Sequence, residues 1–437
     1  MCRYAHAEQQ AAARGRVPMT MRWAAAPCAR AAAIAALLLA LAGCGSAAHT
    51  TAAVEGPQAS CEATVVEDLA RVVRRVYREG VRSERTLVAQ RMIASSAALR
   101  TALSSGDAAA AQAAAQALVA SGHVTNVRVL RGGAVLAQAG GPALAPITGQ
   151  IASASGAPLG TYVASVWSDE GFLIESDGIA QGRVALRRDG RSVGGSLALA
   201  PGKLPAKGST VLGGVPYAYA SFGAIAYPWG PLRVYVFRSV PSTTALCGAT
   251  REATTFKVLS RVAKLIYEGE AGRRTLAEVR RVQANAPLLE AVVRHDPVAA
   301  RHAVELLLNQ HIVRMRVYDR ERLLADVGGP YVLAPVDAPL RLHGHTIGHF
   351  VLSIQDDEGY LRLTRRLAGL SVLMYTAPNA ASPSTLVKNS LGPEPGNVPE
   401  SGRYTYRGAS FQVYTLRAEA FPSGPLTIRV LIPVPYR

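Results

Sequence analysis

Three histidines stand close together in the segment RLHGHTIGHF: His343, His345 and His349. On a β-strand, side chains at i, i+2 and i+6 project from the same face. Three imidazoles on one face can hold Zn²⁺ or a similar ion, so the spacing predicts a candidate metal site. The alternative is an exposed, histidine-rich strand edge, because Gly344 and Gly348 favour a turn that would separate the three rings.

Two cysteines, Cys61 and Cys247, stand at matching places, each just before a segment with helical periodicity. If the two helices lie side by side, their starts can meet and the cysteines can form a disulfide that closes a long loop. The alternatives are two free thiols or a bond to another chain.

Paired carboxylates occur twice, at Asp169-Glu170 and Asp357-Glu358. A hydrolase would use such a pair as acid and base. Each pair nevertheless stands where a strand gives way to a helix, and Asp and Glu stabilise the first turn of a helix. We therefore interpret them as helix starts. The sequence contains no P-loop, HExxH or CxxC, and it predicts neither enzymatic activity nor a cofactor.

The elements that carry these residues occur in two copies. The same motifs recur in the same order at a nearly constant offset of 188 to 194 residues: Arg85–Leu87 with Arg274–Leu276, Gly140–Pro142 with Gly328–Pro330, Asp169–Gly171 with Asp357–Gly359, and Gly230–Leu232 with Gly424–Leu426. The chain is therefore predicted to be a tandem duplication, with repeats over residues 61–243 and 244–437.

Each copy begins with helical periodicity and then alternates like strands. We expect a first helix over 62–79 and 251–268, a second over about 84–103 and 273–294, and a third starting at Asp107 or Asp296, where Asp can act as the N-cap. About five strands follow, with one helix inserted. This order predicts an α+β fold, in which N-terminal helices pack on a mostly antiparallel sheet.

The order of elements resembles that of Cache domains, the PAS-like extracytoplasmic sensors. The segments MRVYDRERLLADVGG (315–329) and IGHFVLSIQDDEGYL (347–361) resemble two strands and a helix of that family. The family's amino-acid-binding pattern is not found. The resemblance implies a small-molecule site between sheet and helices, where aromatic side chains of the second copy are candidates for its lining: Tyr318, Tyr331, Phe350, Tyr360 and Tyr375. The alternative is that most of these rings belong to the core.

The N-terminus has the order of an export signal. Arg22 and Arg30 precede eleven apolar residues at 31–41, which are too short to span a bilayer. The sequence Leu41-Ala42-Gly43-Cys44 resembles a bacterial lipobox, which implies cleavage before Cys44 and a lipid on its side chain. The alternative is an ordinary signal peptide cut nearby. Cleavage before Cys44 makes residues 1–43 the signal peptide and residues 44–60 a flexible tether.

Export changes the meaning of the basic charge. The chain carries +17, and residues 1–43 hold five Arg and one Glu, so the remainder carries +13. Outside the membrane the partners that suit this charge are anionic lipid heads, acidic wall polymers or acidic ligands, and no nucleic acid is expected. The favoured alternative is that most of the arginines are solvated surface, because they are scattered along the chain. The sequence predicts a lipid-anchored protein on the extracytoplasmic face, whose tandem sensor-like domains bind a small ligand and act with a partner protein. The alternative is a structural or interaction lipoprotein of the envelope without a ligand.

Overall fold

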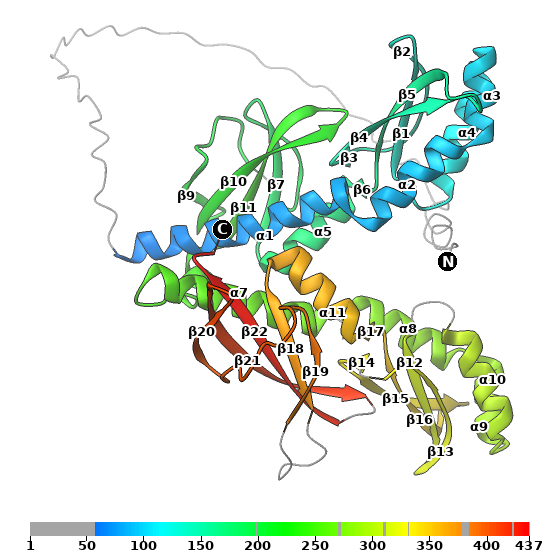
Figure 1. The fold of residues 1–437 in the computed structure, drawn as a ribbon, viewed down its shortest axis with the longest axis vertical. Coiled ribbons are helices and arrows are strands. Elements are labelled where there is room, and N and C mark those ends of the chain that lie inside the picture. The colour runs from blue at the N-terminus through cyan, green and yellow to red at the C-terminus, as the bar shows by residue number, and fades with distance from the viewer. Residues whose placement is uncertain are drawn as a thin grey trace, which may run out of the picture.

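The computed structural model describes residues 57–436, except residues 198, 270–271, 309–311, 331, 377–383 and 422–423. Within these ranges the chain folds as two copies of one α+β unit, each with N-terminal helices followed by antiparallel sheets (Figure 1). The predicted fold class and the duplication are confirmed. The signal peptide, Cys44 and most of the tether lie outside the described residues.

The helices of the two repeats correspond in order. Repeat 1 contains α1 (Pro57–Arg82), α2 (Glu84–Ser95), α3 (Ala97–Ser105), α4 (Ala108–Ala120), α5 (Asp169–Ala180) and α6 (Val240–Thr244). Repeat 2 contains α7 (Arg251–Gly269), α8 (Arg273–Gln283), α9 (Ala286–Val293), α10 (Pro297–Leu308), α11 (Asp357–Leu363) and the π-helix η1 (Thr364–Ala368).

The second helix predicted in each repeat is in fact two helices. Ser96 ends α2, and its side chain accepts a hydrogen bond from Leu99 N, so it also caps α3. In repeat 2, Ala284 ends α8, and the side chain of Asn285 caps α9 by accepting a hydrogen bond from Leu288 N. The predicted helix start at Asp107 is confirmed, because Ala110 N donates to its carboxylate. Side chains that bond the backbone locally interrupt a helix that apolar periodicity alone would continue.

The strands of each repeat form two sheets, where the sequence predicted one sheet of about five strands. Repeat 1 has β1 (Asn126–Arg131), β2 (Ala134–Gly140), β3 (Ala143–Leu144), β4 (Ile147–Ala152), β5 (Pro158–Ser165), β6 (Trp167–Ser168), β7 (Arg183–Arg188), β8 (Arg191–Gly195), β9 (Lys207–Leu212), β10 (Val215–Tyr227) and β11 (Gly230–Ser239). The four-stranded sheet has the order β2-β1-β5-β4, and the seven-stranded sheet has the order β6-β3-β10-β11-β7-β8, with β9 beside β10.

Repeat 2 reproduces this topology strand for strand. Its strands are β12 (Arg314–Asp319), β13 (Arg322–Gly328), β14 (Val332–Leu333), β15 (Val336–Leu342), β16 (His345–Ser353), β17 (Gln355–Asp356), β18 (Ser371–Thr376), β19 (Thr385–Asn389), β20 (Gly402–Tyr406), β21 (Ala409–Phe421) and β22 (Gly424–Val434). They form a sheet of order β13-β12-β16-β15 and a sheet of order β17-β14-β21-β22-β18-β19, with β20 beside β21.

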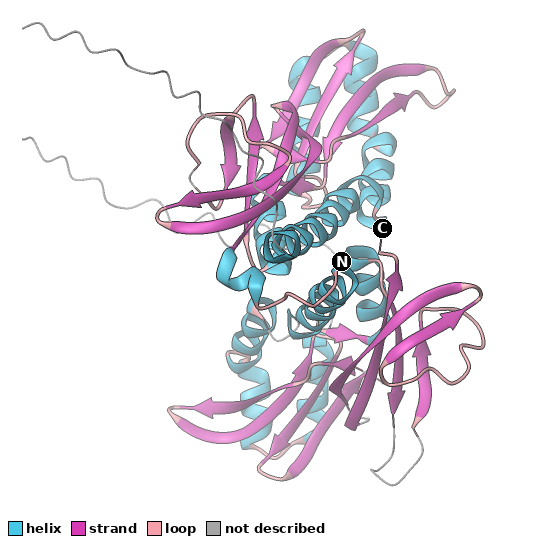
Figure 2. Cartoon of the chain, turned by 90° about the vertical axis from the view of Figure 1, so that its left-hand side faces the viewer, coloured by secondary structure: helices cyan, strands magenta, loops and turns pink. Residues whose placement is uncertain are grey.

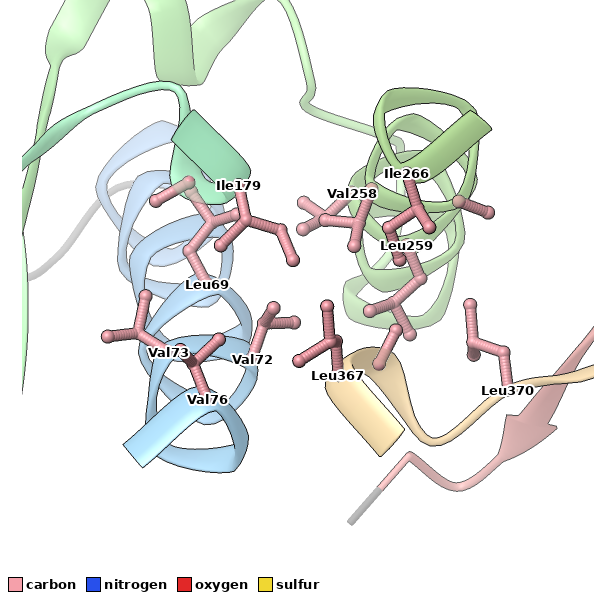
Figure 3. Close-up of a cluster of buried hydrophobic side chains, with 14 of the residues drawn as sticks. Leu69, Val72, Val73, Val76, Ile179, Val258, Leu259, Ile266, Leu367 and Leu370 are labelled. Atoms are coloured by element: carbon pink, nitrogen blue, oxygen red, sulfur yellow. The ribbon is translucent and has the colours of Figure 1, made fainter. Parts of the chain in front are cut away.

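The two repeats share one hydrophobic core. In the view of Figure 2, helices run through the middle of the molecule and sheets lie on either side of them. Side chains of α1 and α7 point toward one another, together with residues of α5, of η1 and of the segment that follows η1 (Figure 3): Leu69, Val72, Val73, Val76, Ile179, Val258, Leu259, Ile266, Leu367 and Leu370, all buried. This burial excludes water from the contact between the repeats, so each repeat completes the other's core.

The four-stranded sheets have their own cores. In repeat 1 this core lies between the sheet and α2, α3 and α4, and in repeat 2 between the sheet and α8, α9 and α10. None of the helices in the described ranges is both long enough and apolar enough to cross a membrane.

Candidate functional site

The predicted cysteine pair is a disulfide within the chain. Cys61 in α1 is bonded to Cys247, just after α6, and their Cα atoms lie 5.8 Å apart. The Cys61 sulfur also lies 3.5 Å from the hydroxyl of Thr254 in α7. The bond therefore joins the first helix of repeat 1 to the segment that opens repeat 2.

The predicted histidine site is not formed. His343 lies in a turn with φ = 50°, and a bulge at Ile347 separates His345 from His349, because Leu340 pairs with Gly348 while Arg341 pairs with Thr346. Within the part of the chain that the structure describes, no three His, Cys, Asp or Glu side chains gather closely enough to hold a metal ion. The two glycines of the segment permit the turn and the bulge that break the strand periodicity.

The candidate aromatic residues divide between core and surface. Phe350 is fully buried on the helix side of its sheet, and Tyr360 is fully buried in the shared core, where its hydroxyl donates to Ala263 O. Tyr375 is 8% exposed, with the Arg429 guanidinium 4.2 Å from its ring centroid. Tyr331 lies outside the described residues. Tyr318 is the one described member of the set on a partly exposed sheet face.

That face belongs to the sheet β13-β12-β16-β15. Met315 and Val317 of β12 point into the core with α8–α10, so Arg314, Arg316 and Tyr318 point away from those helices. We name as the arginine face the residues that share this side of the sheet: Arg314, Arg316, Tyr318, Asp326 and His349.

Charge is concentrated at the centre of the arginine face. Arg314 Nη2 lies 2.7 Å and Arg316 Nε 2.9 Å from carboxylate oxygens of Asp326. Both guanidinium groups also lie against Phe421 of β21, at 5.4 and 4.8 Å from its ring centroid. The side chains of Arg314, Asp326 and Arg316 are only 13, 22 and 25% exposed. Two cations therefore share one anion in a half-buried place, and one positive charge stays uncompensated.

The hydrogen bonds at this place are incomplete. Arg314 Nε is buried and has no hydrogen-bond partner among the described residues. A buried donor without an acceptor costs free energy, and a ligand oxygen would remove that cost. Beside it, the rings of Tyr318 and His349 are stacked with centroids 4.6 Å apart. The arrangement suits a small ligand with a carboxylate and a flat or apolar body.

Repeat 1 has a reduced form of the same face. Arg128 takes the place of Arg316, and Gln138 takes the place of Asp326 across the strand pair. Arg128 Nε is likewise buried without a hydrogen-bond partner in the described part of the chain. The network of two arginines and one aspartate is therefore specific to repeat 2.

The arginines of this face were not predicted as site residues from the sequence. The signal was present in RMRVY, where Arg314 and Arg316 alternate with apolar residues, but nothing in the pattern places Asp326 opposite Arg316 or Phe421 above it. The paired carboxylates lie in the first turns of α5 and α11, although the N-caps are one residue earlier, at Ser168 and Asp356.

No family model matches the sequence, and no curated protein matches it. Among solved structures, the chain is similar to an extracellular ligand binding receptor from Desulfohalobium retbaense, with 12% sequence identity and a TM-score of 0.25. The similarity covers 52% of this chain and 47% of the receptor chain, so the match spans about half of the receptor.

Proposed function

We propose that this protein is an extracytoplasmic lipoprotein, held to a membrane by a lipid on Cys44, whose tandem sensor-like domains bind a small ligand and act with a partner protein. The leader and the LAGC sequence support the anchor. The disulfide between Cys61 and Cys247 supports an oxidising compartment, where structural disulfides persist.

The arginine face carries the ligand-binding part of the proposal. A half-buried cluster with a surplus positive charge and an unsatisfied Arg314 Nε is costly for the fold alone. A bound carboxylate would neutralise the surplus charge and accept the hydrogen bond of Arg314 Nε. Arg316 would provide a charged contact and Phe421 an apolar wall.

Ligand binding is tested by thermal unfolding of the chain from Ser46 onward, which contains every described residue, against carboxylates, amino acids, purines, polyamines and divalent metals. A ligand at 100 times its dissociation constant stabilises the fold by about 2.7 kcal/mol. We expect a monocarboxylate with a flat or apolar body to raise the midpoint and Arg316→Gln to abolish that shift. Arg322→Gln, which removes an exposed charge from the same sheet, should leave the shift intact. No shift with any compound would contradict ligand binding.

The anchor has a separate test. In cells grown with a radiolabelled fatty acid, the full chain should take up label and sediment with membranes, and Cys44→Ser should lose the label. Label that persists in the variant would contradict lipidation at Cys44.

One observation favours the second candidate, an interaction lipoprotein without a small ligand. Arg74, Arg78 and Arg82 are exposed at four-residue spacing along α1. Burial, followed by the charges of Arg74, Arg75 and Arg82, lowers the pKa of Arg78. Such a crowded basic surface suits an acidic partner. If this is the main function, Arg74→Glu with Arg78→Glu should abolish cross-linking to the partner while Arg316→Gln leaves it unchanged.

A further inference from the structure

A basic hollow lies on the seven-stranded sheet of repeat 1. Its volume is about 360 Å³, within the range of small-molecule sites. We name it the basic hollow and define it by the residues that carry the argument: Arg187, Arg188, Lys203, Leu204, Arg233 and Tyr235.

Hydrogen bonds join the sheet to the loop that contributes Lys203 and Leu204 to the hollow. Arg187 of β7, only 5% exposed, donates to Gly202 O at 2.7 Å, to Ala200 O at 3.0 Å and to Gly190 O. Tyr235 of β11 donates its hydroxyl to Leu204 O at 2.8 Å. These contacts fix the wall before any ligand arrives, which lowers the entropic cost of binding.

Four cationic side chains line the hollow together with a single carboxylate. That carboxylate, Asp189, is 88% exposed and lies 3.3 Å from Arg188. The hydrogen bonds of Arg233 go to the Ser221 hydroxyl, and neither Arg233 nor Lys203 has a carboxylate partner in the described part of the chain. The positive charges therefore repel one another, and an anion in the hollow would relieve this repulsion.

Repeat 2 shows that the fold does not require these cations. The strand registers place Tyr375 at the position of Arg187, Thr376 at that of Arg188 and Thr427 at that of Arg233. Arg429 of repeat 2 takes the position of Tyr235, and it donates to Val398 O, so it holds the covering loop there. In repeat 2 the loop is thus held by Arg429, whose guanidinium also lies 4.2 Å from the ring centroid of Tyr375. The cations at the positions of Arg187, Arg188 and Arg233 are found only in repeat 1.

We infer that the basic hollow is a second ligand site, which binds a small organic anion with two or more carboxylates. The cations provide charge-assisted hydrogen bonds to carboxylate oxygens. Leu204 and Pro231 add an apolar wall, which favours an organic ion over a bare inorganic one. This site is separate from the arginine face, and the inference does not depend on the proposed function.

Calorimetric titration of the chain from Ser46 onward with citrate and succinate tests the inference, with the neutral methyl esters and inorganic phosphate as comparisons. We expect binding of a polycarboxylate, no binding of its ester, and at least a tenfold loss of affinity in Arg233→Thr, which installs the residue of repeat 2. The matched control is Arg183→Thr, which removes an exposed charge from β7 outside the hollow and should keep the affinity.

Three results would overturn the inference: no binding of any polycarboxylate, equal losses in Arg233→Thr and Arg183→Thr, or binding of phosphate alone. Circular dichroism of each variant confirms that it is folded. Arg316→Gln distinguishes the two sites, because it should leave binding at the basic hollow unchanged even if the arginine face binds nothing.

Discussion

Cys61 and Cys247 lie 186 residues apart in the sequence, yet a disulfide holds their Cα atoms 5.8 Å from each other where both repeats begin. The bond stands at one end of the contact between α1 and α7. Along the same contact, Val72 and Leu259 are fully buried among side chains of both repeats. The duplicated halves therefore form one body, joined covalently at one end and by apolar packing along their helices.

The disulfide should contribute strongly to stability, because it closes a long loop in the unfolded chain. We expect Cys61→Ser with Cys247→Ser to lower the free energy of unfolding by about 2–5 kcal/mol, measured by guanidinium denaturation. Reductant should shift the midpoint of the wild-type chain and leave that of the double variant unchanged. Equal midpoints for wild type and variant would show that the disulfide contributes little to stability.

The shared core predicts that both repeats unfold together. Leu259 is fully buried between them. Leu259→Ala should lower the free energy of unfolding by about 2–5 kcal/mol, because apolar burial is lost and a cavity is left. The control is Leu276→Ala, at a leucine that is 51% exposed, with an expected change within about 0.5 kcal/mol. Calorimetry should show a single transition in both variants. Two separate transitions in Leu259→Ala, with only the second repeat destabilised, would mean that the cores are independent.

The sequence predicted those parts of the fold that follow from local pattern. Helical spacing located α1 and α7, the constant offset located the duplication, and Asp107 marked the start of α4. The division of the strands into two sheets was not predictable, because it depends on which distant strands pair. The first helix of repeat 1 also begins at Pro57, inside the predicted tether.

The candidate sites were less accessible to sequence reasoning, because each is made by pairing across strands. Arg316 meets Asp326 only through the register of β12 and β13. Arg187 and Tyr375 occupy equivalent positions with different side chains. On the neighbouring strand, Tyr235 and Arg429 are equivalent and differ in the opposite sense, so no motif is repeated at either position. Conversely, the spacing of the three histidines predicted one common face, but a bulge in the strand separates His345 from His349.

The arginine face should show a characteristic pH dependence. Burial raises the pKa of Asp326, but the hydrogen bonds and charges of Arg314 and Arg316 together outweigh burial and lower it from its ordinary value. A lowered pKa in the folded state stabilises the protein at pH values above the ordinary pKa of about 4, and this contribution is lost as the pH falls through the folded-state value.

Asp326→Asn should therefore lower the free energy of unfolding by about 1–3 kcal/mol at pH 7, and its difference from wild type should shrink below about pH 4. Denaturant titrations at pH 7, 5 and 3 measure this. Asp337→Asn, at a carboxylate that is 64% exposed on the same sheet, should change little at any pH. A difference for Asp326→Asn that is as large at pH 3 as at pH 7 would exclude the charge network as its cause.

The backbone beneath the arginine face also requires a glycine. A Cβ at Gly348 would lie 2.2 Å from Tyr318 O on the neighbouring strand, and one at Gly160 would lie 2.4 Å from Leu130 O in repeat 1. Both repeats therefore have glycine where β5 lies against β1 and where β16 lies against β12. Since a carbonyl oxygen in a paired strand cannot rotate away, Gly348→Ala must displace β12, which carries Tyr318 and both arginines.

We expect Gly348→Ala to lower the free energy of unfolding by about 1–3 kcal/mol through this overpacking. It should also weaken the binding of any ligand held by the arginine face. Gly223→Ala is the matched control, because Gly223 also lies within a strand and a Cβ there meets nothing within 4 Å. Thermal unfolding of both variants, with and without the carboxylate found by screening, separates the two effects. If both variants unfold at the wild-type midpoint, the close approach of β16 to Tyr318 does not constrain the sheet.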